Sequence, residues 1–296
     1  EACEYMDSFL SLKPKIEIIL NIDSDHLDYF KDIDHIVSSF DKFAHLVPGS
    51  GTIIAYDANP FVNQVIRDLD NVVTFGLSEN CDYYAANIKF NEDGMPSFDV
   101  CHDGKLLSRV QLAVPGEHNI LNALAAFTCA CVLGVEPALT KETLEAYHGT
   151  QRRFDLVGTT ARGVKIVDDY AHHPTEIKAT LSASENVPHN KLWCIFQPHT
   201  YTRTIALFDE FADAFEKADH LILAEIYAAR EKNIYKISSA QLVEKIKETH
   251  PDKDVLFMED FAAIADYVDS QAQRGDMVIT MGAGDIYKVG EMLLEK

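Results

Sequence analysis

Ionisable side chains are concentrated between Asp168 and Glu176, where the sequence reads Asp-Asp-Tyr-Ala-His-His-Pro-Thr-Glu. The apolar residues 163–167 before them predict a short buried strand, and Pro174 suits the first turn of a helix. In an open α/β sheet, ligands bind at the carboxyl ends of the strands. Two carboxylates and two imidazoles at such an end, beside a helix N-terminus that favours anions, predict a functional site rather than a solvated loop.

Two further stretches carry cations that could meet an anionic ligand. The stretch 197–204 follows another predicted strand and brings His199 and Arg203 to the start of a helix. Arg152 and Arg153 lie within Gln-Arg-Arg-Phe, and a guanidinium presents a planar fork that matches phosphate oxygens. The arginine pair could equally form a bridge between two domains.

Three other stretches are weaker candidates. Residues 21–28 place carboxylates and an imidazole after a predicted strand, which suits a hard cation, and a solvated acidic loop is an equal alternative. Asn119 and Asn122 share one face of an apolar helix, and their amides suit a purine edge. Helix capping by Asn119 is the favoured local alternative. Residues 281–285 are too short for a dinucleotide-binding fingerprint, and their glycines predict a tight strand-to-helix turn.

Apolar periodicity predicts an α/β fold with two domains, 1–152 and 153–296, and a seam near 150–155. In the first half we expect strands at 16–22, 52–56, 72–75, 81–90, 97–101 and 106–112, and helices at 33–46, 120–133 and 141–147. In the second half we expect strands at 164–167, 192–196, 221–224, 255–257 and 277–280, and helices near 174–185, 203–217, 238–249, 259–271 and 286–294. This alternation predicts a mostly parallel, doubly wound sheet in the second half.

The composition excludes several classes of protein. The formal net charge of −21 argues against a nucleic-acid partner, because a phosphate backbone requires a basic face. No apolar run reaches membrane-spanning length and no signal peptide is recognisable, so we expect no membrane partner. Six scattered cysteines without a CxxC pair suit a reducing cytoplasm. The absence of an initiator Met predicts that the chain belongs to a longer protein.

The candidate stretches resemble, in order along the whole chain, the Mur ligases, and among them those that add alanine. The resemblance rests on Glu1–Tyr5 with Ser8–Leu10, Asn21–Ile22 with Asp25–Asp28, Gly116–Asn119 with Asn122–Ala123, Arg152–Phe154, Asp168–Glu176, and Gln197–His199 with Arg203–Thr204. The last two groups are the most specific. The resemblance implies the remainder of a central ATPase domain in residues 1–152 and a Rossmann-like ligase domain in residues 153–296.

The resemblance also implies cofactors, ATP and Mg²⁺, and a role for each matching residue. These roles are Mg²⁺ binding by Glu1 and His26, contact with the adenine side of ATP by His118, Asn119 and Asn122, nucleotide binding and catalysis by Arg153 and Asp169, and substrate binding by Tyr170, His172, His199 and Arg203, with His172 also catalytic.

The implied reaction joins L-alanine to UDP-N-acetylmuramate in peptidoglycan precursor synthesis. ATP converts the muramate carboxylate into an acyl phosphate, and the alanine amine then attacks that carbonyl. Cations and Mg²⁺ are needed because the carboxylate and the phosphates repel each other.

Some features depart from the family pattern. The sequence holds neither a GxxxxGK[S/T] phosphate-binding loop nor the uridine-binding domain of the family, so we expect the chain alone to be inactive. Thr200 stands where some relatives carry Arg, which leaves Arg203 with more of the contact to a substrate carboxylate. The alternatives are a non-catalytic nucleotide- or sugar-binding module and a ligase that recycles muramyl peptides, which the stretch 197–203 disfavours.

Overall fold

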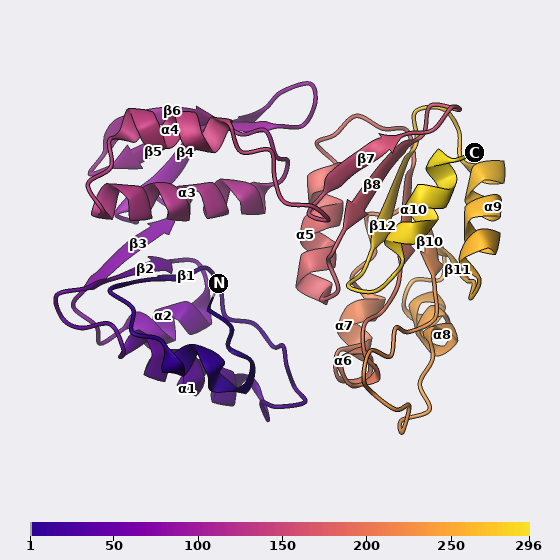
Figure 1. The fold of residues 1–296 in the computed structure, drawn as a ribbon, viewed down its shortest axis with the longest axis horizontal. Helices are drawn as coiled ribbons and strands as arrows, with labels where there is room; N and C mark the ends of the chain where they lie inside the picture. The colour runs from indigo at the N-terminus through magenta and orange to yellow at the C-terminus, as the bar shows by residue number, and fades with distance from the viewer. Residues whose placement is uncertain (1) are drawn as a thin grey trace. The chain divides into compact units, whose positions relative to one another are not determined.

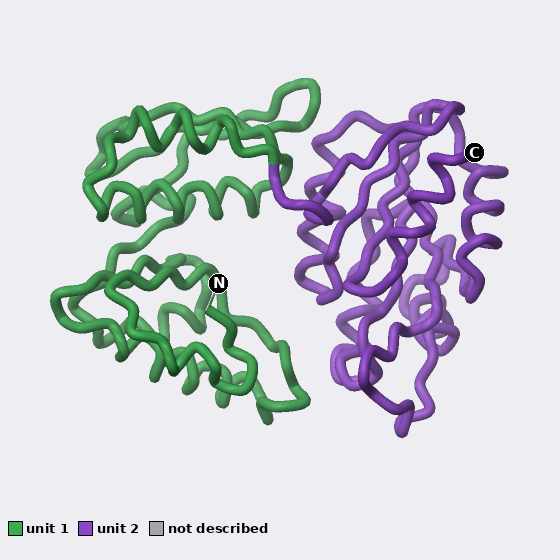
Figure 2. The backbone as a smooth tube through the Cα atoms, viewed as in Figure 1, with its two compact units in different colours: residues 1–148 green, residues 149–296 purple. Residues whose placement is uncertain are grey.

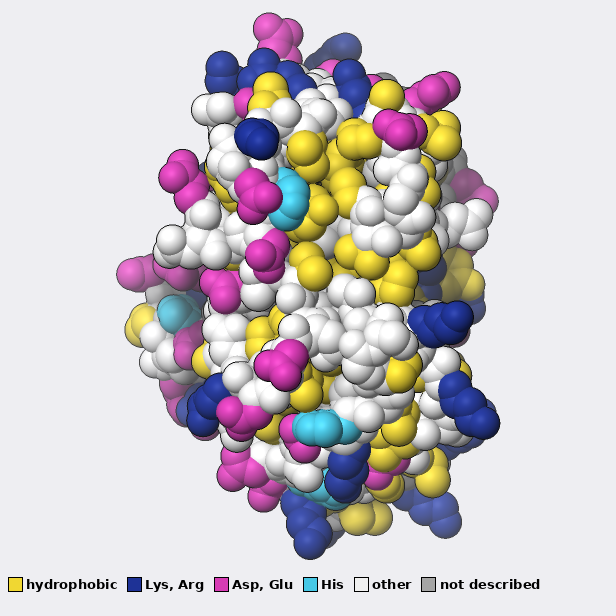
Figure 3. Space-filling model, turned by 90° about the vertical axis from the view of Figure 1, so that its left-hand side faces the viewer, with side chains coloured by type: hydrophobic (Ala, Val, Ile, Leu, Met, Phe, Trp, Pro, Cys, Tyr) yellow, Lys and Arg dark blue, Asp and Glu magenta, His cyan; other side chains and the backbone are white. Residues whose placement is uncertain are grey.

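The computed structural model describes residues 2–296, which form two compact units, unit 1 (residues 2–148) and unit 2 (residues 149–296) (Figure 2). Each unit is built around its own six-stranded sheet. Acidic side chains are interspersed with Lys and Arg on the face seen in Figure 3, in keeping with the net charge of −21. Among the described residues, no helix is both long and apolar enough to cross a membrane.

The sheet of unit 1 is parallel on one side and antiparallel on the other (Figure 1). Its strand order follows the chain, with β1 to β4 parallel and β4 to β6 antiparallel. The strands are β1 (Ile16–Ile19), β2 (Thr52–Tyr56), β3 (Val72–Gly76), β4 (Tyr83–Phe90), β5 (Pro96–His102) and β6 (Lys105–Gln111). A tight turn joins β4 to β5, in which the Asn91 N–H donates to the Met95 carbonyl at 3.0 Å and Gly94 adopts φ 79°.

Helices cover both faces of this sheet. Val37 of α1 and Val62 of α2 belong to the core on one face, together with Ile53 of β2. Phe127 of α3 belongs to the core on the other face, together with Phe75 of β3. The helices of unit 1 are the 3-10 helix η1 (Tyr5–Ser11), α1 (Ile33–Ala44), α2 (Pro60–Ile66), α3 (Glu117–Val132) and α4 (Pro137–Glu145).

The sheet of unit 2 has the order β11-β10-β9-β12-β8-β7. All its neighbours are parallel except β7 and β8. The strands are β7 (Asp155–Thr159), β8 (Lys165–Asp169), β9 (Leu192–Phe196), β10 (His220–Leu223), β11 (Asp254–Phe257) and β12 (Met277–Met281). The central strands β9 and β12 are buried at every residue, as continuous apolar runs in a parallel sheet should be.

Two helical layers enclose this sheet. Val268 of α9 and Val289 of α10 pack with Val278 of β12. In a separate contact, the Phe211 ring of α7 lies 5.7 Å from that of Phe196 in β9. The helices are α5 (Pro174–Ser184), α6 (Tyr201–Ala206), α7 (Phe208–Ala212), α8 (Ser239–Thr249), α9 (Phe261–Gln271) and α10 (Tyr287–Leu294). The predicted α/β fold, with a doubly wound second half, is therefore confirmed.

One predicted helix is wrong and three elements were not predicted. The helix expected over 203–217 is interrupted at Leu207 (φ −115°, ψ 31°), which separates α6 from α7. No Gly or Pro marks this bend, and Leu207 is buried, so packing rather than local propensity determines it. The pattern also does not predict η1, α2 or β7. The start of α2 had a readable signal, because Asn59 caps it and Pro60 is its first residue.

Candidate active site

Arg152 anchors the segment that enters unit 2. Its Nε donates to Asp168 Oδ2 at 2.8 Å, and its Nη2 donates to the Gly282 carbonyl at 2.7 Å. The guanidinium carbon lies 5.0 Å from the ring centroid of Tyr170 and 4.9 Å from that of Tyr287. Arg152 also adopts a left-handed backbone conformation, with φ 59°. Arg152 is therefore part of the fold of unit 2. Its side chain links Asp168, Gly282 and the two tyrosine rings within that unit, and these contacts do not form the predicted bridge between two domains.

Arg153 has a different environment from its neighbour. Its side chain is 53% exposed, and its Nη1 lies 3.7 Å from Glu176 Oε1. Its guanidinium carbon lies 5.4 Å from the Tyr170 ring centroid. The chain thus presents Arg153 to solvent beside the start of α5, where its fork could meet phosphate or carboxylate oxygens.

Asp169 ends β8 and its carboxyl group turns inward. Oδ1 accepts the Ala171 N–H at 2.7 Å, and Oδ2 accepts the Phe154 N–H at 2.7 Å. Burial raises the pKa of Asp169 to about 6, although these two N–H groups favour the ionised form. The carboxyl group therefore ties the turn that carries Arg153 to the end of β8.

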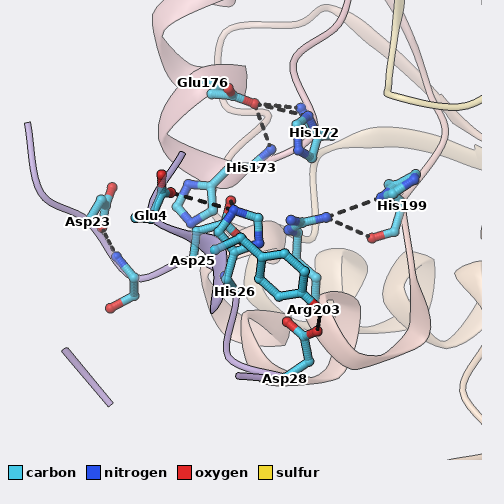
Figure 4. Close-up of polar contacts among 12 residues, drawn as sticks. Glu4, Asp23, Asp25, His26, Asp28, His172, His173, Glu176, His199 and Arg203 are labelled. Carbon is cyan, nitrogen blue, oxygen red and sulfur yellow. Dashed lines mark hydrogen bonds and ion pairs between the residues drawn. The ribbon is translucent and has the colours of Figure 1, made fainter. Parts of the chain in front are cut away.

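The residues predicted to start a helix at Pro174 do so. His173 is the N-cap of α5, and its Nδ1 accepts the Thr175 N–H at 3.3 Å. Glu176 Oε2 accepts the N–H groups of His172 at 2.9 Å and His173 at 3.2 Å, which completes a capping box (Figure 4).

The four predicted substrate residues form one connected group in unit 2. The rings of Tyr170 and His172 are 5.4 Å apart, and those of His172 and His199 are 5.7 Å apart. Arg203 Nη1 donates to His199 Nδ1 at 3.2 Å and to the His199 carbonyl at 3.4 Å (Figure 4). The loops after β8 and β9 and the first turn of α6 thus bring two imidazoles, a phenol and a guanidinium together, which suits an anionic ligand.

Side-chain hydrogen bonds also stabilise the start of α6, the helix that carries Arg203. Thr200 adopts φ 66°, and its Oγ1 accepts the Arg203 N–H at 3.4 Å. Glu231 accepts the Thr202 N–H at 2.9 Å and also bonds the Thr202 hydroxyl. Glu231 lies 29 residues from Thr202 and belongs to no recognisable motif, so the sequence does not predict this contact.

The glycines after β12 permit a close approach of two backbones. Gly282 adopts φ 147°, and a Cβ atom there would lie 2.6 Å from the Gln197 carbonyl. A Cβ atom on Gly284 would lie 2.5 Å from Gln197 Oε1, which accepts the Asp285 N–H at 3.1 Å. The predicted tight strand-to-helix turn is confirmed.

The candidate metal-binding residues of unit 1 make fewer contacts with one another than the substrate residues of unit 2. His26 adopts φ 54°, and its Nε2 lies 3.5 Å from Glu4 Oε1 and 4.0 Å from Asp25 Oδ2 (Figure 4). The Tyr5 hydroxyl donates to Asp28 Oδ2 at 2.9 Å. Glu1 lies outside the described residues. Within residues 2–296, no group of three or more His, Cys, Asp or Glu side chains is arranged to hold a metal ion.

The predicted adenine-side residues lie in the first turns of α3. The favoured capping alternative for Asn119 is wrong, because Gly116 is the N-cap of α3 and Asn119 is the third helical residue. Asn119 Nδ2 instead donates to the Pro115 carbonyl at 2.8 Å, and Asn122 Nδ2 donates to Asn119 Oδ1 at 3.3 Å. The two amides share one face, as predicted, and His118 lies in the same turn.

Comparison with known families identifies both units. The family model described as Mur ligase middle domain matches residues 4–130, and that described as Mur ligase, glutamate ligase domain, matches residues 152–284. The chain is 48% identical to the UDP-N-acetylmuramate–L-alanine ligase of Alkaliphilus metalliredigens over 295 residues. That match covers 99% of this chain and 63% of the relative, so the chain spans less than two thirds of the relative's length.

Solved structures of Mur ligases share the fold. The UDP-N-acetylmuramate-alanine ligase MurC of Thermotoga maritima matches with a TM-score of 0.77 and 26% identity, over 98% of this chain and 61% of that one. A murein peptide ligase from Psychrobacter arcticus matches with a TM-score of 0.69 and 24% identity, over 97% of this chain and 58% of that one, which shows the fold alone. With both family models matched in order and 48% identity along its length, the chain belongs to the Mur ligase family.

Proposed function

We propose that this chain forms the central and C-terminal parts of a cytoplasmic, ATP-dependent ligase that joins L-alanine to UDP-N-acetylmuramate in peptidoglycan precursor synthesis. The observation that carries the proposal is the 48% identity to a ligase of that name along 99% of the chain. The connected group of Tyr170, His172, His199 and Arg203 supports it, because both substrates carry carboxylates that need cationic partners.

Unit 1 would handle the nucleotide and Mg²⁺. His26 and Glu4 offer an imidazole and a carboxylate 3.5 Å apart, and Glu1 would add a second carboxylate. This donor set fits Mg²⁺, which keeps several waters and phosphate oxygens and needs only one or two protein carboxylates. Bound there, the ion would neutralise phosphate charge. His118 and the amides of Asn119 and Asn122 would contact the adenine.

Unit 2 would supply the cations for the reaction. A muramate carboxylate oxygen attacks the γ-phosphorus of ATP, ADP leaves, and Arg153 would stabilise the charge on the transferring group. We assign Asp169 the task of holding the turn that presents Arg153, because its carboxyl group accepts the Phe154 N–H.

The second step needs a base. The alanine amine attacks the acyl phosphate carbon, phosphate leaves, and the amine loses a proton, for which we propose His172 as the acceptor. His199 and Arg203 would hold the substrate carboxylate, with the Tyr170 ring packed against that of His172.

The test is a coupled assay of the full-length protein with Mg²⁺-ATP and UDP-N-acetylmuramate. We expect ADP release that depends on L-alanine, and a product whose mass equals that of the nucleotide sugar plus one alanyl residue. ADP release that depends instead on L-alanyl-γ-D-glutamyl-diaminopimelate would favour the recycling ligase. No amino-acid-dependent release with either acceptor would contradict a ligase and favour the binding module.

A further inference from the structure

Glu176 stands at the centre of the contacts around Arg153. Its Oε2 accepts the N–H groups of His172 and His173, at 2.9 and 3.2 Å, and so caps α5. Its other oxygen, Oε1, lies 3.7 Å from Arg153 Nη1. One carboxylate thus fixes a helix start with one oxygen and faces a cation with the other.

The same carboxylate also touches an imidazole. His172 Nδ1 lies 3.3 Å from Glu176 Oε2 and 3.0 Å from the Tyr170 carbonyl. Arg153 is therefore flanked by the Tyr170 ring at 5.4 Å and by Glu176, and Glu176 in turn contacts His172. Because the cap immobilises the carboxylate, it can act as a fixed anchor for the Arg153 guanidinium and the His172 imidazole.

Capping alone does not require the negative charge of Glu176. Helix α8, in the same unit, has a capping box in which Gln241 Oε1 accepts the Ser238 N–H at 2.9 Å. An amide oxygen therefore caps a helix of this unit in the same geometry. The negative charge of Glu176 is therefore not needed for the cap, and it can instead interact with the neighbouring side chains of Arg153 and His172.

We propose that Glu176 is a positioning residue that holds the Arg153 guanidinium and the His172 imidazole in place for the reaction. The proposal rests on the proposed ligase function. A surface ion pair of this kind contributes little to stability, so its effect should appear in turnover rather than in unfolding. A catalytic group that is displaced from its position in the transition state lowers the rate of the reaction strongly.

The first test is a double-mutant cycle in the full-length protein. Glu176→Gln keeps an amide oxygen for the cap but turns an NH₂ group towards Arg153. We expect kcat to fall about tenfold, with KM for UDP-N-acetylmuramate and Tm nearly unchanged. In the Arg153→Ala background the same change should lower kcat by clearly less than tenfold, because only the contact with His172 remains to be lost.

Gln241→Ala is the matched control, because it removes a capping amide remote from Arg153. We expect it to lower Tm without changing kcat. The proposal is overturned if Glu176→Gln retains wild-type kcat, or if its loss in kcat is equally large in the Arg153→Ala background.

A second test does not depend on turnover. In the 296-residue chain, the {¹H}-¹⁵N NOE of the Arg153 Nε–H should fall in Glu176→Gln, whereas that of Arg152, held by Asp168 at 2.8 Å, should stay high. An unchanged Arg153 NOE would refute the anchor even if the full-length protein is an active ligase. A fall in the NOE together with an inactive full-length protein would instead refute the proposed function and leave the anchor standing.

Discussion

The two units differ in how completely they build their candidate functional groups. In unit 2, Arg152, Asp169 and Glu176 are bonded to backbone groups of the same unit, and Glu176 also lies 3.7 Å from Arg153 Nη1. In unit 1, His26 pairs with Glu4 at 3.5 Å, and no larger cluster of metal-ligating side chains is found in residues 2–296. We therefore propose that unit 2 carries a preformed anion-handling site, whereas the proposed metal residues of unit 1 would acquire their geometry with the ion and nucleotide.

The largest expected effect concerns turnover by the chain itself. No GxxxxGK[S/T] sequence occurs in the 296 residues, and such a loop is what cradles the β- and γ-phosphates. We expect the purified chain to show no alanine-dependent ATP hydrolysis above background, despite its ordered unit 2. Measurable hydrolysis would mean that unit 1 can bind and position the β- and γ-phosphates without a GxxxxGK[S/T] loop.

The next effect is that of Arg153→Ala in the full-length protein. A forked cation that acts in the transition state commonly contributes about 2.7–4 kcal/mol, so kcat should fall about 10²–10³-fold with little change in Tm. Arg162→Ala is the matched control, because Arg162 is also half-exposed and lies 3.5 Å from Asp269. Unchanged turnover, or unfolding of the variant, would favour a structural bridge.

A buried carboxyl group without a hydrogen-bond partner should make the stability of unit 1 depend on pH. Glu17 in β1 is 3% exposed, and its two oxygens have no hydrogen-bond partner within residues 2–296. Burial raises its pKa to about 8. Because the folded state binds this proton more tightly than the unfolded state, the stabilisation it gives below about pH 4.5 is lost as the pH rises towards 8.

Glu17→Gln should therefore resemble the wild type at pH 5 and be more stable by about 1–3 kcal/mol at pH 9. Amide hydrogen exchange of β2, the partner of β1, is the measurement. The fluorescence of Trp193, the single tryptophan, reports unit 2 and should not change. Glu79→Gln, at an exposed position, is the control, and an equal shift in both variants would show that Glu17 is not a special group.

Much of the site could be predicted from sequence because it lies at strand ends. Strands β8 and β9 flank β12 in a parallel sheet, so the loops after them meet at one edge. This placement brings His172 close to His199, as the two motifs indicated. Short apolar runs bounded by turn residues also gave β2 and β9 their observed limits.

The roles of neighbouring residues could not be predicted in the same way. Nothing local separates Arg152 from Arg153, because the partner of Arg152 is the Gly282 carbonyl, 130 residues away. Glu176 lies within the most informative motif, yet its contact with Arg153 depends on the left-handed turn at Arg152 and Phe154. Such positive φ values at non-glycine residues are set by tertiary bonds and leave no mark in the sequence.

The measurement that tests the preformed site most directly is an NMR titration of the 296-residue chain with inorganic phosphate. The net charge of −21 opposes anion binding at long range, but salt of about 0.15 M screens that field beyond roughly 8 Å. We predict weak, saturable shifts of the His172, His199 and Arg203 side-chain resonances, with His26 unchanged. Phosphate that moves none of these three groups would contradict the account, and show that unit 2 does not form its anion site by itself.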